Sequence, residues 1–333
     1  MFFEQMEMYV SAGLSVNEAL DVIGKAAKKK RADSIQIMRK AVESGQNLST
    51  TLENEVNLPS SVIGLVACGE TTGSLAQTLK SCHALLDEQD ELIKKVLSSM
   101  TYPIVIGIAT VGLTIGLVQG IMPQIIPLLS GLHVDLPILT KIVITVSRLL
   151  INYGLMGAIG ACVLIGALFL VYKKVFLVRQ FVHRCLMYVP IIGNLVSQYS
   201  LALFFQSFGA MIEAGISSDI AYEKAVSSIY LIPLRNRLEK FAGSLRGGEK
   251  IHIIAENMPA YIESIISAGE ASGNLGRSLE RVASMISKEL DYALKRLTAL
   301  VEPAMMLGMG GMVGSIALSI MMPIYDISKT LQR

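Results

Sequence analysis

The chain has 333 residues, of which 52% are hydrophobic and only 17% are charged, with a formal net charge of +2. Because soluble domains carry about 25% charged residues, this composition indicates an integral membrane protein. The small net charge argues against a nucleic-acid partner, and the four cysteines, which lack CxxC spacing, are expected to be free thiols in a reducing compartment.

Residues 1–100 are predicted to form a first cytosolic helical domain. From Val16 to Ile23, apolar residues recur at roughly the 3.6-residue period of a helix. Ser15 lies three residues before Glu18, which is the spacing of a capping box at the start of a helix. No segment alternates apolar and polar residues over the length of a strand, so we expect an all-α bundle.

The motif Gly69-Glu70-x-x-Gly73-x-Leu75 is predicted to form a tight turn between two helices. Its two glycines permit positive φ, and Ser74 is suited to cap the next helix. Glu70 precedes that helix, so we expect its carboxylate to face the positive N-terminus that begins near Leu75. Turn and cap chemistry explain the motif without any further role; the alternative is a contact surface for a partner protein.

The last helix of this domain is predicted to continue into the membrane. An apolar stripe begins at Leu75 and meets no helix breaker before Pro103, and no charged residue lies between Lys95 and Asp135. A bilayer requires roughly 20 apolar residues, and a charge at its centre costs about 2.5–3.5 kcal/mol. We therefore predict a first transmembrane helix at residues 103–126, with a proline kink where it enters the membrane.

A second transmembrane helix is predicted at residues 150–172, because the window between Arg148 and Lys173 contains no charge. Residues 127–149, between the two spans, are predicted to form an external loop. Residues 173–300 are predicted to contain a juxtamembrane segment and a second cytosolic helical domain.

The juxtamembrane segment is basic and amphipathic. It combines Arg179, His183 and Arg184 with Phe176 and Phe181. Such a stretch is expected to lie along the cytoplasmic membrane surface and to bind anionic lipid.

The second cytosolic domain repeats the first. The motif CGETTGSL at residues 68–75 returns as AGEASGNL at residues 268–275, a shift of 200 positions. Upstream, Phe2-Phe3 returns as Phe204-Phe205, a shift of 202. A repeat of this length indicates two copies of one structural unit. The residues of the second copy that receive the same predicted roles are Gly269, Glu270, Gly273, Leu275 and Pro303.

A third transmembrane helix is predicted at residues 303–325, followed by an external tail at residues 326–333. Basic residues lie before the first and third spans and after the second. By the positive-inside rule both polar domains and the N-terminus are then cytoplasmic, and the C-terminus is external. The middle span has no repeat partner, and its predicted role is to return the chain to the cytosol.

The paired Gly-Glu-x-x-Gly-x-Leu turns, each followed by a proline where the helix enters the membrane, resemble the GspF/PilC family. Members of this family are inner-membrane platform proteins of type II secretion and type IV pilus systems. Pro190-Ile191-Ile192-Gly193 and the run from Phe204 to Gly215 also match, so the resemblance extends over nearly the whole chain. The short form of this chain is similar to versions from type IVb pilus, conjugative thin-pilus or competence systems.

The resemblance implies a platform for pilus or pseudopilus assembly in the bacterial inner membrane. It implies as partners a cytoplasmic assembly ATPase, inner-membrane accessory proteins, the transmembrane helices of pilins or pseudopilins, and further copies of the chain. It implies no cofactor.

Small residues recur four positions apart in the first and third predicted spans. They are Gly112, Gly116, Gly120, Gly310 and Gly314. This spacing lets helix backbones approach closely in lipid. We expect packing among the three spans; self-association and docking of a pilin transmembrane helix are the alternatives.

The sequence contains no catalytic constellation. No Walker A, HExxH or GxSxG pattern occurs, and the four histidines lie on different predicted elements. We therefore expect a non-enzymatic protein with no metal site. The alternative function is a small-solute transporter or channel, which would require charged or polar groups at mid-span. The spans offer only groups such as Thr110, Thr114 and Gln119.

Overall fold

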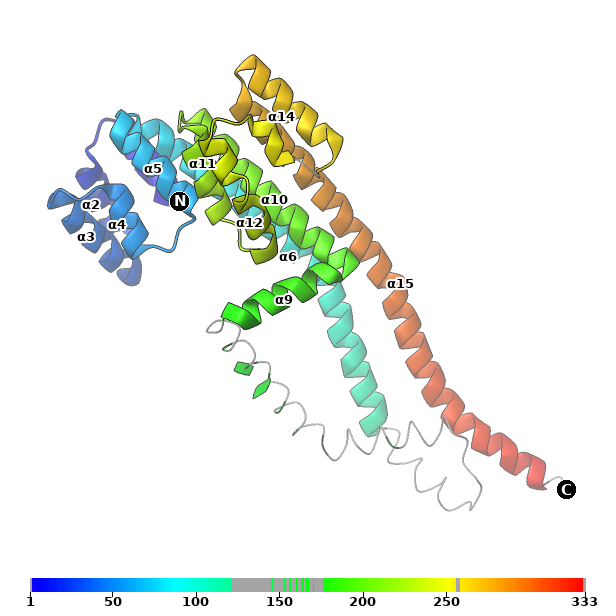
Figure 1. Ribbon diagram of the computed structural model, residues 1–333. Coiled ribbons are helices and arrows are strands. Elements are labelled where there is room, and N and C mark those ends of the chain that lie inside the picture. Colours follow the sequence, from blue (N-terminus) through cyan, green and yellow to red (C-terminus); the bar gives the residue numbers. More distant parts are fainter. Residues whose placement is uncertain are drawn as a thin grey trace. The chain divides into compact units, whose positions relative to one another are not determined.

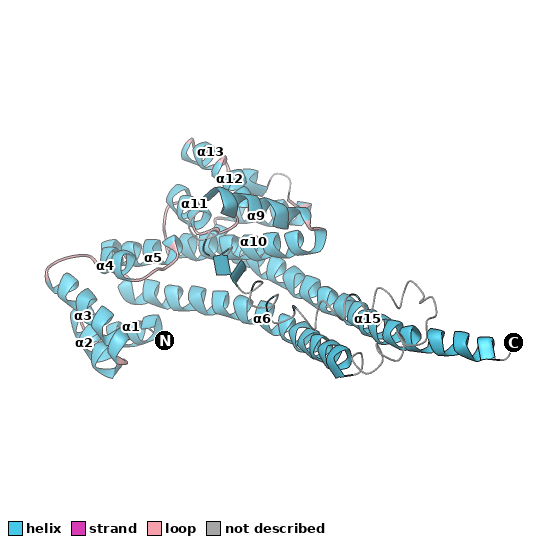
Figure 2. Ribbon diagram, turned by 90° about the horizontal axis from the view of Figure 1, so that it is seen from below, coloured by secondary structure: helices cyan, strands magenta, loops and turns pink. Residues whose placement is uncertain are grey.

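The computed structural model describes residues 2–120, 176–255 and 258–331, together with single positions between 145 and 170. All regular elements in these ranges are helices, which confirms the all-α prediction for this part of the chain (Figure 1, Figure 2). Apart from Thr145, the predicted loop at 127–149 lies outside the described residues, as do residues 121–126 of the first predicted span and most of the predicted span at 150–172.

The first copy of the repeat consists of consecutive helices, most of which pack on the next helix in the chain. Its elements are α1 (Phe2–Ser11), α2 (Val16–Ala26), α3 (Lys29–Glu43), α4 (Leu48–Glu55), α5 (Ser60–Thr72) and α6 (Leu75–Gly120). The predicted capping box begins α2, because Oγ of Ser15 accepts from the N–H of Glu18 at 3.3 Å and the Glu18 carboxylate accepts from the N–H of Ser15 at 2.9 Å.

The second copy follows the same order, but its first helix is longer and a 3-10 helix stands where the first copy has α4. Its elements are α10 (Pro190–Glu213), α11 (Ser218–Ser227), α12 (Ile232–Glu239), α13 (Ala242–Arg246), the 3-10 helix η1 (Ile251–Ala255), α14 (Ala260–Ser272) and α15 (Leu275–Leu331), and α9 (Phe176–Tyr188) precedes them. Where the first copy has the single helix α3, the second has the two shorter helices α12 and α13.

The chain forms two compact units. One comprises Met1–Lys95 and Gln180–Ala293, so that it contains the bundles of both copies. The other comprises Val96–Arg179 and Leu294–Arg333. The boundary between the units falls inside α6, α9 and α15.

Within the first unit, the two copies pack on each other through α5, which contacts α10 and α11. The N–H of Ser61 donates to Oγ of Ser228 at 3.3 Å. Gly64 lies close enough to α10 and α11 that an added Cβ would be at 3.7 Å, an ordinary contact distance, from Met211 and Lys224. The copies therefore share an interface with little room for larger side chains.

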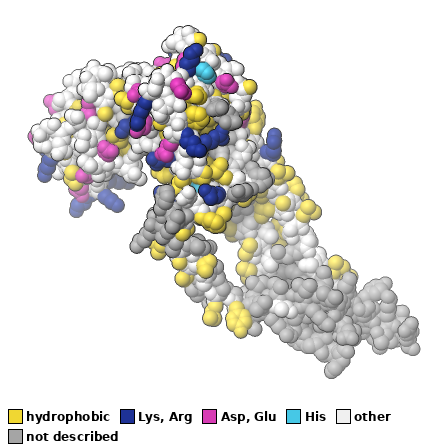
Figure 3. Space-filling model, in the orientation of Figure 1, with side chains coloured by type: hydrophobic (Ala, Val, Ile, Leu, Met, Phe, Trp, Pro, Cys, Tyr) yellow, Lys and Arg dark blue, Asp and Glu magenta, His cyan; other side chains and the backbone are white. Residues whose placement is uncertain are grey.

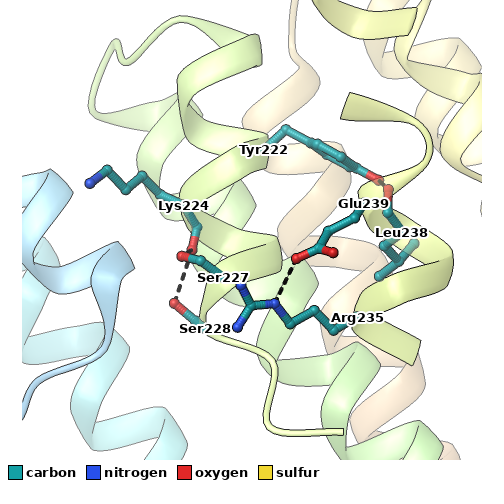
Figure 4. A network of polar contacts seen from close by, with 7 residues as sticks. All are labelled: Tyr222, Lys224, Ser227, Ser228, Arg235, Leu238 and Glu239. Carbon is teal, nitrogen blue, oxygen red and sulfur yellow. Dashed lines mark hydrogen bonds and ion pairs between the residues drawn. The ribbon is translucent and has the colours of Figure 1, made fainter. Parts of the chain in front are cut away.

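The core of the second copy contains an aromatic cluster. The rings of Phe204 and Phe208 lie 5.6 Å from the ring of Tyr222. The Tyr222 hydroxyl donates to the carbonyl of Leu238 at 2.8 Å and thereby joins α11 to α12 (Figure 4). Burial raises the pKa of Tyr222, so the hydroxyl remains a neutral donor.

Among the described residues, three helical segments are long and apolar enough to cross a membrane. They are Leu75–Gly116 in α6, Ile192–Glu213 in α10 and Leu275–Ser315 in α15. Half of the most apolar window in α10 is buried inside the protein, whereas none of the corresponding windows in α6 and α15 is. A helix that is apolar all round is buried either in a core or in lipid. Burial in the core explains α10, and α6 and α15 are left with exposed apolar surface.

Candidate functional site

Each predicted turn follows a helix that ends at a glycine with left-handed backbone. Gly73 follows α5 and Gly273 follows α14, and both have φ +70°. The N–H of Gly273 donates to the carbonyl of Glu270 at 3.4 Å, and that of Asn274 to the carbonyl of Gly269 at 2.9 Å. This pair of bonds satisfies the last carbonyls of α14, and glycine adopts positive φ without steric cost. The prediction of positive φ is confirmed for these two glycines.

The other glycine of each motif was predicted wrongly to have positive φ. Gly69 and Gly269 are buried inside α5 and α14. A Cβ built on Gly69 would collide with Oγ1 of Thr78 in α6, and one on Gly269 would collide with the side chain of Ser278 in α15. These glycines are therefore required for the close approach of consecutive helices. The repeat pairs Thr78 with Ser278, a sequence signal that the turn interpretation did not use.

Glu70 and Glu270 each bind a helix N-terminus, but not the predicted one. Glu70 accepts hydrogen bonds from the N–H groups of Leu48 and Ser49 at the start of α4. Glu270 accepts from the N–H of Ile251 at 2.8 Å, at the start of η1. The unpaired N–H groups and positive dipole of a helix start favour a carboxylate. The motif glutamates thus stabilise the helix before α5 or α14, and not α6 or α15.

The surroundings of Glu270 favour its ionised form. Burial acts to raise the pKa of Glu270, but the N–H of Ile251 and the contact with His252 outweigh burial, so the pKa lies below the ordinary value of 4.5. Nδ1 of His252 lies 3.1 Å from Oε2 of Glu270. In the first copy the N-cap residue Asn47 forms no side-chain cap, so Glu70 supplies the acceptor that α4 lacks.

The helix that follows each turn is continuous beyond the predicted proline. Leu75 is the first residue of α6, which has 46 residues and contains Pro103. Leu275 is the first residue of α15, which has 57 residues and includes Pro303. The prediction that each cytosolic helix continues into an apolar segment is confirmed for α6 and α15.

The predicted packing glycines of α6 and α15 do not lie close to another described helix. A Cβ built on any of the predicted packing glycines would meet no described atom within 4 Å; they are Gly112, Gly116, Gly120, Gly310 and Gly314. Gly107, which the spacing argument did not select, lies closer to the other helix, because an added Cβ would be 3.7 Å from Cε of Met305. Packing among the three spans, self-association and docking of a pilin transmembrane helix therefore all stay predictions.

Carboxylates from both copies line one cavity of the first unit. Its volume is about 320 Å³, and its wall includes Glu88 and Glu91 from α6, Glu213 from α10 and Glu280 from α15. Partial burial and the neighbouring charges of Glu280 and Glu91 raise the pKa of Glu88. Partial burial and the charge of Glu213 raise that of Glu280, although Arg277 opposes the shift. Lys95 also lines this cavity.

The described part of the chain contains no group of three or more His, Cys, Asp or Glu side chains placed to hold a metal ion. The paired turns bring a carboxylate together with backbone N–H groups at a helix start, joined by the hydroxyl of Ser49 in the first copy and by the imidazole of His252 in the second. Their geometry fixes where α6 and α15 begin relative to the helices before them.

Comparison with known proteins identifies the repeat. The family described as "Type II secretion system (T2SS), protein F" matches residues 2–123 and again residues 204–323. A type IV pilus assembly protein PilC from Thermus thermophilus is 28% identical over 99% of this chain and 82% of its own length. PilC from Pseudomonas aeruginosa is 24% identical over 99% of this chain and 90% of its own length. The type II secretion system protein F of that species is 26% identical over 98% of this chain and 81% of its own length.

The first prediction concerns Gly69. Gly69→Ala forces a Cβ against Thr78, and overpacking of this kind costs about 1–3 kcal/mol. Cys82, one turn beyond Thr78, is buried, and its thiol pKa is raised to about 12, so it is labelled only when α5 and α6 separate. In a chain whose only cysteine is Cys82, the substitution should accelerate labelling by about 5- to 150-fold.

Gly64→Ala is the matched control, because Gly64 lies in the same helix and an added Cβ makes only ordinary contacts. It should leave the labelling rate of Cys82 unchanged or lower it, since alanine favours helix. Equal effects of the two substitutions would show that Gly69 has no special steric role.

The second prediction concerns Glu270. Glu270→Gln removes a charged acceptor from the start of η1, a loss of about 1–3 kcal/mol. A Val282→Cys probe, at the repeat position of Cys82, should be labelled faster in this variant. Because the folded pKa of Glu270 is lowered, its contribution is present above pH 4.5 and is lost as the pH falls through the folded pKa. The difference between the variant and the parent should therefore shrink in acid.

A pyridyl disulfide, which reacts with thiols at acidic pH, allows the measurement across this range. Glu263→Gln, an exposed position in the first turn of the same helix, is the control and should change the labelling of the probe much less, because its carboxylate has only the solvent-screened interaction with the helix dipole. A difference that stays constant with pH would contradict the assigned role of the Glu270 charge.

The third prediction concerns the carboxylate cavity. The folded pKa values of Glu88 and Glu280 are raised, so their favourable contribution is present below pH 4.5 and is lost as the pH rises through the folded values. At neutral pH, Glu88→Gln and Glu280→Gln should therefore slow the labelling of Cys82. The two cavity variants should also reduce the pH dependence of the Cys82 labelling rate above pH 4.5. The control Glu43→Gln, which lies outside the cavity, should change neither the rate nor its pH dependence. Faster labelling in either cavity variant at neutral pH would contradict this prediction.

Proposed function

This chain belongs to the family of type II secretion system protein F, and we propose that it is an inner-membrane platform for assembly of a type IV pilus or a type II secretion pseudopilus. Relatives over nearly its whole length are named for type IV pilus assembly and for type II secretion. The family match falls on both copies of the repeat. Its two segments begin 202 residues apart and end 200 apart, the same shifts found in the sequence.

The observation that supports a mechanical role is the path of α6 and α15. Each helix begins at a glycine turn whose preceding helix is fixed by a buried glycine and a capping glutamate. Each then continues without interruption into a segment whose apolar window is not buried in the protein. A continuous helix transmits displacement along its axis, so movement at the turns would reach the membrane. We infer that the two helices couple a cytosolic motor to pilin-like subunits in the bilayer.

The motor must be a partner, because no nucleotide-binding pattern occurs in the sequence. We propose a cytoplasmic assembly ATPase for this role, inner-membrane accessory proteins and further copies of the chain as neighbours, and pilin or pseudopilin transmembrane helices as cargo. The glycines of α6 and α15 offer surfaces that a cargo helix could approach closely.

The proposed topology places residues 1–100 and 173–300 in the cytosol, with spans at 103–126, 150–172 and 303–325. The N-terminus is then cytoplasmic, and the loop at 127–149 and the C-terminus are external. The distribution of basic residues supports this orientation.

The fourth prediction tests this function in the cell that encodes the chain. Deletion of the chain should abolish surface filaments or secretion, while the pilin or pseudopilin subunits accumulate in the inner membrane. The intact chain should restore assembly. A chain with four residues of glycine and proline inserted after Leu97 should not restore it, because the insertion interrupts α6 between the turn and the membrane.

Two further measurements complete the test. The same insertion in the exposed link between α13 and η1, after Gly248, is the control and should support assembly. An alkaline phosphatase fusion at Arg333 should be active, as an external C-terminus requires. Full assembly without the chain would exclude the platform role, and solute flux through liposomes that contain only this chain would favour a transporter.

A further inference from the structure

The helix α9 is attached to the bundle of the second copy by its buried side. The N–H of Ile232, the first residue of α12, donates to Nδ1 of His183 on α9 at 3.3 Å. His183 and Ile232 are only 7% and 8% exposed. The imidazole thus accepts from one of the N–H groups that a helix start leaves without a backbone partner, and it holds α9 against α12.

The corner between α9 and α10 is also fixed. A Cβ built on Gly193, in the first turn of α10, would lie 2.6 Å from the carbonyl oxygen of Met187 in α9. The N–H of Gly193 donates to the carbonyl of Val189, the N-cap residue of α10, at 2.7 Å. Because only glycine permits so close an approach, the segment Pro190-Ile191-Ile192-Gly193 limits the direction of α9 relative to α10.

The outward side of α9 is apolar with a basic edge. At roughly 100° per residue, Phe181 lies about 160° around the helix from His183, so the two side chains point to nearly opposite sides. Phe181 is 69% exposed, and Arg184 and Cys185 on the same side are also exposed. In Figure 3, hydrophobic and basic side chains are visible together over the position that α9 has in Figure 1. His183, which the sequence groups with Arg179 and Arg184, is therefore not part of this surface.

Exposed apolar side chains continue beyond the outward side of α9. Met187 near the end of α9, Val189 in the link and Ile192 in the first turn of α10 are between 40% and 45% exposed. Tyr230, in the link that leads to α12, is 81% exposed. Apolar side chains that are exposed together on neighbouring segments are typical of an interaction site. The name α9 surface is used for Phe181, Arg184, Cys185, Met187 and Tyr230.

The charge of this part of the chain indicates the chemistry of the partner. From Lys173 to Ile212 the sequence contains four Lys or Arg residues and no Asp or Glu. Aromatic rings lie at the headgroup level of a bilayer, and guanidinium groups bind phosphates while their stems lie on apolar surface. An apolar helix side with a basic edge and no carboxylate therefore suits the surface of an anionic membrane.

The proposed second span places α9 beside such a surface. The span ends at residue 172, and α9 begins at Phe176. Four residues extend over at most about 14 Å, so the start of α9 cannot lie farther than that from the end of the span. The connectivity of the chain therefore brings the α9 surface to the cytoplasmic face of the bilayer.

We propose that the α9 surface binds the cytoplasmic leaflet and fixes the bundle of the second copy to it. Phe181, Met187 and Tyr230 would lie among the headgroups with their apolar parts toward the acyl chains. Arg184 would bind the phosphate of an anionic lipid.

This contact restrains a bundle and not a loose helix, because His183 joins α9 to α12 and Gly193 fixes it on α10. A bundle held on the leaflet gives α15, which begins within it, a fixed start. The inference rests on the proposed span at 150–172, but not on the role in pilus or pseudopilus assembly.

The test measures how close α9 lies to lipid. The full chain, with Cys185 as its only cysteine, is labelled with a fluorophore and placed in nanodiscs whose lipids include some with a nitroxide quencher on the headgroup. The remaining lipid is phosphatidylcholine, either alone or mixed with phosphatidylglycerol. A probe at Ser267→Cys, an exposed position on α14, is the comparison.

The Cys185 probe should be quenched, more strongly in the anionic discs, whereas the probe at Ser267→Cys should be quenched much less. A basic residue at an anionic surface contributes roughly a fivefold factor to binding. Arg184→Glu should therefore lower the ratio of lipid-bound to released α9 surface about 5- to 30-fold in the anionic discs, and Arg184→Lys should retain most of the quenching. Phe181→Ser should reduce the quenching in both kinds of disc.

Two matched controls change exposed side chains of the second copy outside the α9 surface. Lys250→Glu reverses an exposed cation, and Ile220→Ser removes an exposed apolar side chain. Both should leave the quenching of the Cys185 probe unchanged.

Three outcomes would overturn the proposal: equal quenching of the two probes, unchanged quenching after Arg184→Glu in anionic discs, or unchanged quenching after Phe181→Ser. Protection of Cys185 from a water-soluble thiol reagent in cells but not in nanodiscs would assign the α9 surface to a protein partner and would also overturn it. Filament assembly and the activity of the phosphatase fusion are measured independently, so failure of the proposed function is distinguishable from failure of the lipid contact.

Discussion

In each copy a single carboxylate holds several helix ends at one point. Glu70 lies near the end of α5, binds the start of α4, and precedes by a few residues the glycine from which α6 departs. At the negative end of its own helix this charge would be unfavourable, but the positive end of α4 compensates for it. The direction of α6 is then limited by Gly69, whose lack of a side chain admits Thr78. The long helix therefore starts from a junction with little freedom.

The same junction recurs in the second copy although its surroundings differ. Glu270 binds the start of a 3-10 helix instead of an α-helix, and His252 takes part where the first copy has a serine hydroxyl. Three features are present in both copies: the glutamate that accepts hydrogen bonds, the helix start that it binds, and the buried glycine that lets the next helix approach. Because these are the elements that set where α6 and α15 begin, their persistence is consistent with a shared mechanical role for the two turns.

The sequence predicted the features that depend on neighbours along the chain. The capping box at Ser15, the left-handed glycines Gly73 and Gly273, and the continuity of α6 and α15 follow from local spacing and from the absence of breakers. The target of Glu70 could not be predicted in this way, because its hydrogen-bond donors at Leu48 and Ser49 are more than 20 residues upstream.

Features that arise only from packing could not be predicted from the sequence either. The cavity that joins Glu88 to Glu280 requires the first and second copies to be side by side, and the apolar length of α10 is explained by burial in the core, which hydropathy alone does not distinguish from a membrane span. Periodicity identifies which residues are apolar, but not which surface covers them.

The two long helices start from equivalent turns but are held differently, and this difference bears on how they could transmit movement. α15 is held closely against α10, because Cβ atoms built on Gly209 and Gly276 would lie 3.1 Å from the backbone of Glu280 and 2.6 Å from Cγ of Glu213. At the repeat shifts, Glu7 replaces Gly209 and Ala76 replaces Gly276, so α1 cannot approach α6 in the same way. The start of α6 therefore lacks the two glycine-mediated approaches by which α10 holds α15, so a displacement applied to the first copy would meet a different restraint at α6. Two helices that respond unequally to one input would shift relative to each other, which a pair of equally fixed helices would not do.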